Sequence, residues 1–503
     1  MNGQGKSLYQ KYADIMPVGA GALFFIQIFA TMAFSVLYST LVLYTTNKLH
    51  LSDTVATGIT ASFVAFNFAL HLLGGYIGGR FLSYRSLFSF GMGLQVIGCI
   101  LLSVPSTNSL YWGLAAFLSG AGLNVTCINC MLTQLFNPDD KRREAAFLWN
   151  YSGMNIGFFI GFSVSGYFQL QSAYHTLFLC ACFGNLMALL VAALKWKTLN
   201  DTNTHFLKLT KSEKFWANVK GISFITILVL ALRVLLKNSH YSNHLIMVVG
   251  VLMAFVMTLL AVKQPTIEAR NKMFAYMILA FTALVFWTIY QLTPMGLMLF
   301  IERNVDRHYL GLLIAPQWVQ NINTVVIIIG GPVLSVVFAS MRNRGVGFTI
   351  PMQFGIALLL IGLSMAILPI GIHFANMQGY TNFNWIFACY VLQSIGELFI
   401  SPIGYAMVGQ LAPIQLQGLM MGTWLMITGV AATLSGYFSN MALSSSTSTD
   451  PLLTNAGFSH IFNLLGWTAL ATGVILLLLV PTLLRLTQEM KVIISAQDKA
   501  MVI

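Results

Sequence analysis

The stretch CYVLQSIGELFISPIGY, residues 389–405, is an apolar run with one acidic residue, Glu397, near its centre. A helix that crosses a bilayer needs about 20 mostly apolar residues, and this run lies within such a segment. Burying a lone carboxylate at that depth costs on the order of several kcal/mol, so an intramembrane acid that faces a bundle interior is a candidate functional residue. The alternative is a protonated glutamic acid that only hydrogen-bonds a neighbouring helix.

The rest of the chain has the same apolar character. Of its 503 residues, 57% are hydrophobic and only 8% are charged. The apolar segments are too long and too uniform for barrel strands, which have about 10 residues of alternating polarity, so we predict an all-α polytopic membrane protein. We expect fourteen spanning helices, at residues 18–46, 53–79, 84–105, 109–136, 145–170, 175–194, 221–237, 244–262, 273–301, 311–340, 347–374, 384–411, 418–443 and 457–485.

The distribution of basic residues predicts the topology. An even number of helices puts both termini on one side of the membrane. All of the 26 Lys and Arg residues are predicted on that side or in its loops except Lys48, Arg233, Lys237, Arg303 and Arg307. The positive-inside rule therefore puts both termini in the cytoplasm. The net charge of +12 then reflects topology and contact with membrane lipids, and we expect no nucleic-acid partner.

The longest internal hydrophilic stretch, residues 195–220, divides the helices into six before it and eight after it. Two six-helix bundles would place a substrate site between them near the bilayer midplane. The predicted parts are a cytoplasmic tail (1–17), an N-terminal bundle (18–194), a cytoplasmic linker (195–220), an extra helix hairpin (221–262), a C-terminal bundle (263–485) and a second cytoplasmic tail (486–503). We expect the hairpin to sit beside the bundles without contacting substrate.

Polar residues share one face of the Glu397 helix. Gln393, Glu397 and Ser401 recur every four residues, and Tyr390 lies one turn before Gln393. Such a stripe lines a cavity or a helix interface, and Pro402 predicts a local break. Because we find no Lys or Arg at matching depth, the missing cation is expected to be a substrate ammonium group or a proton.

Other chemistries find little support in the sequence. The six cysteines all lie in predicted helices, and Cys127-x-x-Cys130 has no flanking histidine or second pair, so small-residue packing is favoured over a metal or redox site. The chain has no nucleophile elbow, phosphate loop or zinc helix. We therefore predict no enzyme activity, no catalytic residues, no metal and no cofactor.

Residues 392–413, LQSIGELFISPIGYAMVGQLAP, closely resemble the tenth core helix of the proton-dependent oligopeptide transporter (POT) family of the major facilitator superfamily. Other segments match in the same order, and the resemblance runs from about residue 20 to about residue 485. These segments are GGYIGGR (74–80), PDDKRREAAFLWNYSGMNIG (138–157), FWTIYQLTPMGLMLFIERNVDR (286–307), APQWVQNIN (315–323) and LMMGTWLM (419–426). The resemblance implies two six-helix bundles with the extra pair of bacterial members between them.

The resemblance also implies site residues. The glutamate matching Glu397 contacts the amino terminus of the peptide in that family. Tyr151, Asn155 and Asn323 match residues that contact the peptide, and Trp424 matches a residue that lines a pocket. The predicted substrate-binding set is Glu397, Tyr151, Asn155, Asn323, Gln291, Gln393, Ser401, Trp424 and Tyr38.

Several departures make this chain a divergent member. The first helix of the family carries two glutamates and an arginine at the positions of Gln27, Ala30 and Thr31. A second arginine of that helix corresponds to Tyr38, the lysine of the fourth helix to Val125, and the glutamate of the seventh helix to Gln291. The cations that receive the peptide carboxylate are therefore missing, whereas the acid that receives the amine remains.

We therefore predict a secondary active transporter that imports di- or tripeptides, or peptide-like amines, by proton coupling and alternating access. Glu397 and His71 are the candidates for proton coupling, although a neutral His71 bonded to a helix backbone is an equal alternative. The alternatives for function are a facilitator of a siderophore or amine metabolite with lost or altered coupling, a nutrient receptor that does not transport, and a subunit that modulates another membrane protein.

The loops supply candidates for gating. Arg80 and Arg85 follow the second helix, and Arg342 and Arg344 occupy the equivalent cytoplasmic loop of the second half. In facilitator-type proteins these loops hold the cytoplasmic gate closed. The family's acid before the first arginine is Gly79 here, which should weaken that closure. We expect a monomer in the bacterial inner membrane.

Overall fold

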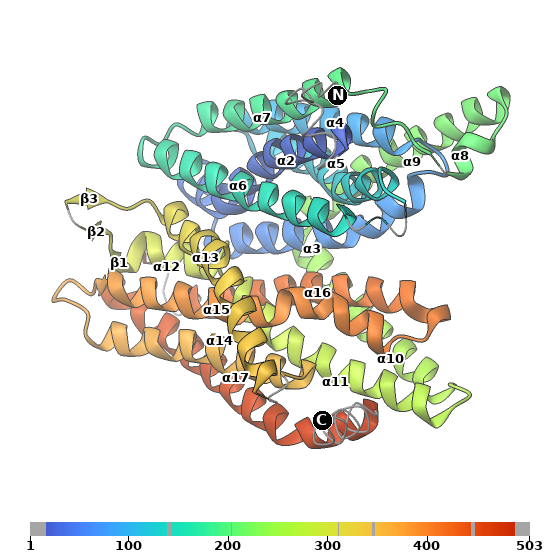
Figure 1. Cartoon of the computed structure of the whole chain (residues 1–503). Helices are drawn as coiled ribbons and strands as arrows, with labels where there is room; N and C mark the ends of the chain where they lie inside the picture. Colours follow the sequence, from blue (N-terminus) through green and yellow to red (C-terminus); the bar gives the residue numbers. More distant parts are fainter. Residues whose placement is uncertain are drawn as a thin grey trace, which may run out of the picture. The chain divides into compact units, whose positions relative to one another are not determined.

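The computed structural model describes residues 17–487 apart from 138, 139, 141, 203, 310, 345–347 and 444–447. These residues are almost entirely helical (Figure 1), so the predicted all-α architecture is confirmed. Thirteen of the described helices are long and apolar enough to cross a membrane. The remaining predicted span corresponds to α6 (Arg142–Leu170), which is as long as the others but richer in polar residues.

The described part of the chain divides into two compact units. The first contains the chain up to His50 together with Phe66–Ser239, and the second contains Leu51–Ala65 together with the chain from His240 onward. The division therefore falls inside α3 (Asp53–Ile77) and again next to the junction of two helices, α9 and α10. The predicted bundle and linker boundaries remain predictions, and the two predicted tails lie almost wholly outside the described residues.

The first unit is built on two long helix pairs. Within it, α4 packs along α5, and α2 packs along α6 and α7. Gly157 and Gly161 of α6 lie so close to α2 that neither position has room for a Cβ atom, as is typical of membrane helices. Its elements are α2 (Val18–Leu43), the π-helical turn η1 (Tyr44–Lys48), part of α3, α4 (Tyr84–Ser103), α5 (Thr107–Gln134), α6, α7 (Tyr174–Leu194), α8 (His205–Lys208) and α9 (Lys211–Lys237).

The second unit contains the Glu397 helix. In this unit α14 packs along α17 and α15, and α13 also lies against α15. Its elements are part of α3, α10 (Ser239–Val262), α11 (Ile267–Tyr290), α12 (Gly296–Asn304), the short strands β1 (Val305–Asp306), β2 (His308–Tyr309), β3 (Leu312–Leu313) and β4 (Thr381–Asn382), α13 (Pro316–Asn343), α14 (Ile350–His373), α15 (Phe383–Leu411), the 3₁₀ turn η2 (Ile414–Leu416), α16 (Gln417–Leu443) and α17 (Pro451–Thr487). Strand β1 pairs in parallel with β4, and β2 pairs antiparallel with β3.

Two local predictions are wrong, the continuous helix 273–301 and the break at Pro402. The predicted continuous helix 273–301 is broken, because α11 ends at Tyr290 and α12 begins at Gly296. Pro294 lies in the gap, where its missing N–H and the restriction on the preceding residue disfavour a helix. Pro402, by contrast, does not break α15, which continues through it to Leu411. A membrane helix tolerates one lost backbone hydrogen bond where neighbouring helices support it.

Each helix of the predicted extra hairpin is attached within its own unit. In the first unit the Arg233 guanidinium lies 4.4 Å from the centre of the Trp112 ring and donates to Asn108 at 3.2 Å, which ties α9 to α5. In the second unit Asn243 of α10 accepts from the Ser62 hydroxyl at 2.9 Å and donates to the Gly58 carbonyl at 3.2 Å. The helices are therefore grouped with different units, and the separate hairpin stays a prediction.

Candidate substrate site

The predicted polar face of α15 is graded in its burial. Tyr390 and Gln393 are buried, whereas Glu397 and Ser401 are partly exposed. The amide of Gln393 donates to the Cys389 sulfur at 3.4 Å, one turn earlier on the same helix. Tyr390 and Gln393 therefore belong to the packed interior, and the partly exposed part of the stripe begins at Glu397.

The carboxylate of Glu397 is held by a neighbouring helix. The Asn323 amide, on α13, donates to Glu397 Oε2 at 2.8 Å and to the Ser394 hydroxyl at 3.1 Å. The Ser394 hydroxyl donates its own proton to the Tyr390 carbonyl at 2.6 Å. Because that proton is already used, Ser394 can only accept from Asn323, and the Asn323 amide is oriented with its donor towards the carboxylate.

All the partners of Glu397 within the second unit are neutral. The Tyr290 hydroxyl, at the end of α11, also hydrogen-bonds the carboxylate. Among the described residues, no ion pair joins Glu397 to a Lys or Arg side chain. An ionised Glu397 would therefore be solvated by two polar side chains while its charge stays uncompensated, which favours the approach of a cation.

The other predicted site residues of the second unit are more deeply placed. Gln291 is 2% exposed and closes the C-terminus of α11, directly before the break. Trp424 is 4% exposed, with its ring 6.2 Å from that of Phe354. Gly404 of α15 leaves the space that the Trp424 ring fills, since a Cβ atom there would overlap the indole. Trp424 therefore packs against α15 at Gly404.

In the first unit the departures from the family motif form a neutral network. The Gln27 amide donates to the Thr31 hydroxyl at 2.9 Å, one turn along α2. The Asn150 amide, on α6, donates to the Gln27 side-chain oxygen at 3.4 Å. All three residues are less than 10% exposed. Two hydrogen bonds between uncharged groups therefore join α2 to α6 at this level, and the Asn150 side-chain oxygen is buried without a hydrogen-bond partner among the described residues.

The aromatic and amide residues predicted in this unit lie beside that network. Tyr151 is 45% exposed, and Asn155, one turn later on α6, donates to the Tyr151 carbonyl at 3.0 Å. Tyr38 of α2 lies 5.9 Å from Phe34, measured between ring centres, and Val125 of α5 is 40% exposed. Tyr151 is therefore partly accessible, whereas the Asn155 amide is engaged within its helix.

His71 lies on α3 in the first unit. Its ring packs edge-on against Phe68 at 5.8 Å, and its Nε2 atom is buried with no hydrogen-bond partner among the described residues. Its backbone carbonyl accepts from the Thr126 hydroxyl at 2.7 Å. The alternative prediction, a neutral imidazole hydrogen-bonded to a helix backbone, is therefore not met at Nε2.

The candidate gating residues are committed to different contacts. The Arg80 guanidinium lies 4.9 Å from the centre of the Tyr76 ring. Arg85 donates to the Trp196 carbonyl at 2.5 Å and stacks 4.5 Å from the Trp196 ring, so it holds the predicted linker. Arg344 is exposed, and the side chain of Arg342 lies outside the described residues.

Gly79, which replaces an acid of the family, has a conformational role. Its φ of +73° lies in the left-handed region, which disfavours any side chain. A Cβ atom there would come within 3.2 Å of Thr204 and Tyr84. The Gly79 carbonyl accepts from the Phe206 N–H at 2.8 Å, so the loop after α3 is tied to the linker through its backbone.

Sequence reasoning missed three polar residues of these clusters. Ser394 lies three residues before Glu397, next to the four-residue stripe, and its helical spacing was the available signal. Tyr290 and Asn150 adjoin Gln291 and Tyr151 in the chain, but their contacts come from other helices and leave no sequence pattern.

The comparisons with known proteins agree on one family. The profile of the POT family matches residues 85–456. The chain belongs to the POT family. It is 30% identical over 473 residues to dipeptide and tripeptide permease A of Salmonella typhimurium, covering 93% of this chain and 92% of the permease. It is 29% identical over 486 residues to the permease of the same name from Escherichia coli K12, covering 95% and 94% of the two chains.

Solved structures give the same answer for the fold. A peptide transporter of the POT family crystallised with sulfate superposes with a TM-score of 0.82 at 25% identity, covering 93% of this chain and 96% of that one. A POT family transporter in complex with 5-aminolevulinic acid superposes with a TM-score of 0.79 at 23% identity, covering 93% and 97%. The predicted major facilitator fold is confirmed, and family membership makes this POT protein a multi-pass membrane transporter and not an enzyme.

Proposed function

We propose that this POT protein imports di- and tripeptides, or peptide-like compounds, whose amino group is received by Glu397. The observation that carries the proposal is the Glu397 carboxylate, which Asn323 and Tyr290 hydrogen-bond and which forms no ion pair among the described residues. An ammonium group would add the missing charge and form charge-assisted hydrogen bonds. The names of the curated relatives, dipeptide and tripeptide permeases, support peptides as the substrate class.

The first unit would receive the rest of the substrate with neutral groups. Gln27, Thr31 and Asn150 are joined by hydrogen bonds between uncharged groups, and Tyr151 is 45% exposed. A peptide carboxylate would meet no fixed cation among these residues. The site therefore favours substrates by their amine and gains little from their carboxylate.

Proton coupling would use Glu397 or His71. Glu397 can exchange a proton for a substrate amine, and His71 has a buried ring nitrogen without a hydrogen-bond partner. Alternating access would be biased by the loop arginines Arg80 and Arg85, which act on conformation more than on ligand contact. We propose a monomer in the bacterial inner membrane, with both termini in the cytoplasm.

The function is tested by uptake into proteoliposomes that contain the purified protein. A labelled dipeptide should accumulate when the outside is more acidic than the inside, and the same peptide with an acetylated amine should compete poorly. Uptake that only equilibrates, with or without a pH gradient, would identify a facilitator. Binding of the dipeptide with no uptake under either condition would identify a receptor.

A non-peptide amine is the second candidate substrate. The absent cations remove the group that would select a peptide carboxylate. A POT family transporter has also been crystallised in complex with 5-aminolevulinic acid, which has an amine and no peptide bond. Competition separates the two candidates. An amine without a peptide bond that competes as well as a dipeptide favours the second, and one that competes at least tenfold worse favours the first.

A further inference from the structure

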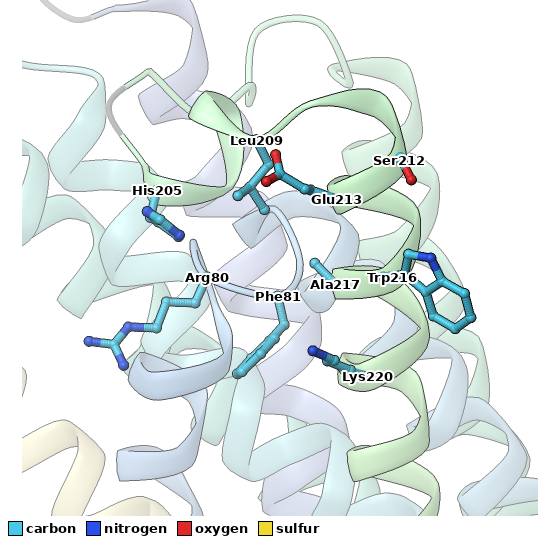
Figure 2. A pocket seen from close by; sticks show the side chains of 9 residues that line it. All are labelled: Arg80, Phe81, His205, Leu209, Ser212, Glu213, Trp216, Ala217 and Lys220. Atoms are coloured by element: carbon cyan, nitrogen blue, oxygen red, sulfur yellow. The ribbon is translucent and has the colours of Figure 1, made fainter.

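A hollow lined by several charged and aromatic side chains lies in the first unit, away from the residues assigned to the substrate. It has a volume of about 760 Å³ and lies between the loop after α3 and the segment that contains α8 and the first turns of α9. Figure 2 shows its nine lining side chains, which come only from these two parts of the chain. They are Arg80, Phe81, His205, Leu209, Ser212, Glu213, Trp216, Ala217 and Lys220.

The charges around this hollow favour an anion. Figure 2 shows Arg80 and His205 on one side of Phe81, and Lys220 on the other side with its ammonium group turned towards Phe81. Glu213 also lines the hollow, but its carboxylate accepts from the Thr210 N–H and hydroxyl, both at 2.8 Å, in the N-terminal capping box of α9. The acid is therefore engaged at the helix end. Arg80 and Lys220 both line the hollow, and the Arg80 guanidinium is turned away from Phe81 in Figure 2.

The surroundings of the hollow match a membrane interface. Trp216 is 58% exposed and its neighbour Phe215 62% exposed, and such aromatic side chains anchor at the level of lipid headgroups. After Lys220, α9 becomes mostly apolar, with Ile222 and Ile227 exposed along it. A ligand with a charged head and an apolar tail would thus place its head among the basic residues and its tail along α9.

We propose that this hollow binds the phosphoryl headgroup of an anionic membrane lipid, with Arg80 and Lys220 as its charge partners. Lys and Arg residues near a membrane surface attract anionic lipid, and basic pockets between helices hold such headgroups. A bound lipid would join the loop after α3 to α9. Arg80 would then contact both the Tyr76 ring and the lipid headgroup. The proposal is independent of the transported substrate.

The test is lipid binding to the purified full chain, measured by native mass spectrometry and by thermal unfolding in detergent. Phosphatidylglycerol should bind and raise the unfolding midpoint more than phosphatidylcholine does. The double variant Arg80→Gln/Lys220→Gln should weaken phosphatidylglycerol binding by about tenfold or more, since two charges near the surface are removed. The matched control Lys208→Gln removes an exposed charge of α8 that does not line the hollow, and it should weaken binding by less than about threefold.

Two further measurements keep the test decisive. A phosphatidylglycerol analogue with a photoreactive group near its headgroup should label residues 205–220 of the unmodified protein. Inorganic phosphate should neither raise the unfolding midpoint nor displace the lipid. Equal binding of the two lipids, an equal loss in Lys208→Gln, labelling elsewhere, or stabilisation by inorganic phosphate alone would each overturn the proposal.

Discussion

The two polar clusters of this transporter differ in charge although both are built from helix pairs. In the second unit, the Asn323 amide on α13 and the Tyr290 hydroxyl on α11 hydrogen-bond the carboxylate of Glu397 on α15. In the first unit, α2 and α6 are joined by Gln27, Thr31 and Asn150, which carry no charge. The neutral cluster is joined by hydrogen bonds between uncharged groups, whereas no ion pair is described at the charged cluster. This difference supports the proposal that the substrate contributes its positive charge to the second unit.

The comparison predicts its largest effect at Glu397. Glu397→Gln keeps the shape and a hydrogen-bonding group but removes the charge, so the lost interaction should be about 1.5–3 kcal/mol. Binding of a dipeptide, measured by calorimetry or thermal shift, should then weaken roughly tenfold to a hundredfold. The fold should survive, because a neutral amide is cheaper to bury than an ion and no described cation is left unpaired.

A double-mutant cycle controls this prediction. Acetylating the substrate amine should cost the unmodified protein heavily and Glu397→Gln little, because both changes remove the same contact. Losses that simply add would mean that the carboxylate does not meet the amine. Glu397 would then be a proton site or a structural acid.

A smaller effect is expected from the group that orients the carboxylate. Asn323→Ala removes the 2.8 Å hydrogen bond to Glu397 while leaving Tyr290 in place, so dipeptide affinity should fall by about tenfold. Affinity for the amine-acetylated peptide should not change, which separates positioning of Glu397 from general loss of structure. Ser394→Ala is the matched control. It removes the second acceptor of Asn323 and the bond to the Tyr390 carbonyl but keeps the Asn323–Glu397 hydrogen bond, so its loss should be smaller. Equal losses for both peptides would contradict the positioning role.

The sequence predicted Glu397 itself better than the residues that hydrogen-bond and orient it. Glu397 is found from sequence because a lone acid in an apolar helix is costly wherever it lies, and the four-residue spacing locates its face. Asn323 entered only through the family resemblance, and Ser394 and Tyr290 were missed, since contacts between helices leave no periodic signal. The break at Gln291–Met295 and the unbroken helix at Pro402 show that a proline predicts a lost N–H, whereas neighbouring helices decide whether the chain turns.

The neutral cluster makes a prediction about the carboxyl end of the substrate. Because Thr31, Tyr38 and Val125 stand where the family has cations, amidating the carboxyl terminus of a peptide should change its binding by less than about tenfold. Competition between a dipeptide and its amide measures this directly. A much larger loss would reveal a cation that serves the first unit, and the contrast between the two clusters would fail.

The smallest effect concerns Asp201, a buried acid that lies outside the spanning helices. Asp201, in the predicted linker, is 4% exposed and accepts from the Tyr84 N–H at 3.1 Å and the Thr204 hydroxyl at 3.2 Å. Burial raises the pKa of Asp201 above its ordinary value of 3.8, against the opposing effect of these hydrogen bonds and Arg85. Unlike Glu397, this acid is bonded to the backbone of its own unit, so we expect a structural role.

The sign of its pH dependence follows from that shift. With a raised pKa, the folded protein keeps a proton that the unfolded chain has lost, so stability falls as the pH rises through the window above 3.8. Asp201→Asn keeps an acceptor for the Tyr84 N–H and should remove this fall while changing the free energy of unfolding near neutral pH by less than about 1 kcal/mol. Asp201→Ala leaves the Tyr84 N–H without its acceptor and should cost about 1–3 kcal/mol. Thermal unfolding of the three proteins from about pH 4 to about pH 7 measures both effects. If instead Asp201→Asn abolished peptide binding at unchanged stability, the linker acid would belong to function, and Glu397 would no longer be the acid that distinguishes the two units.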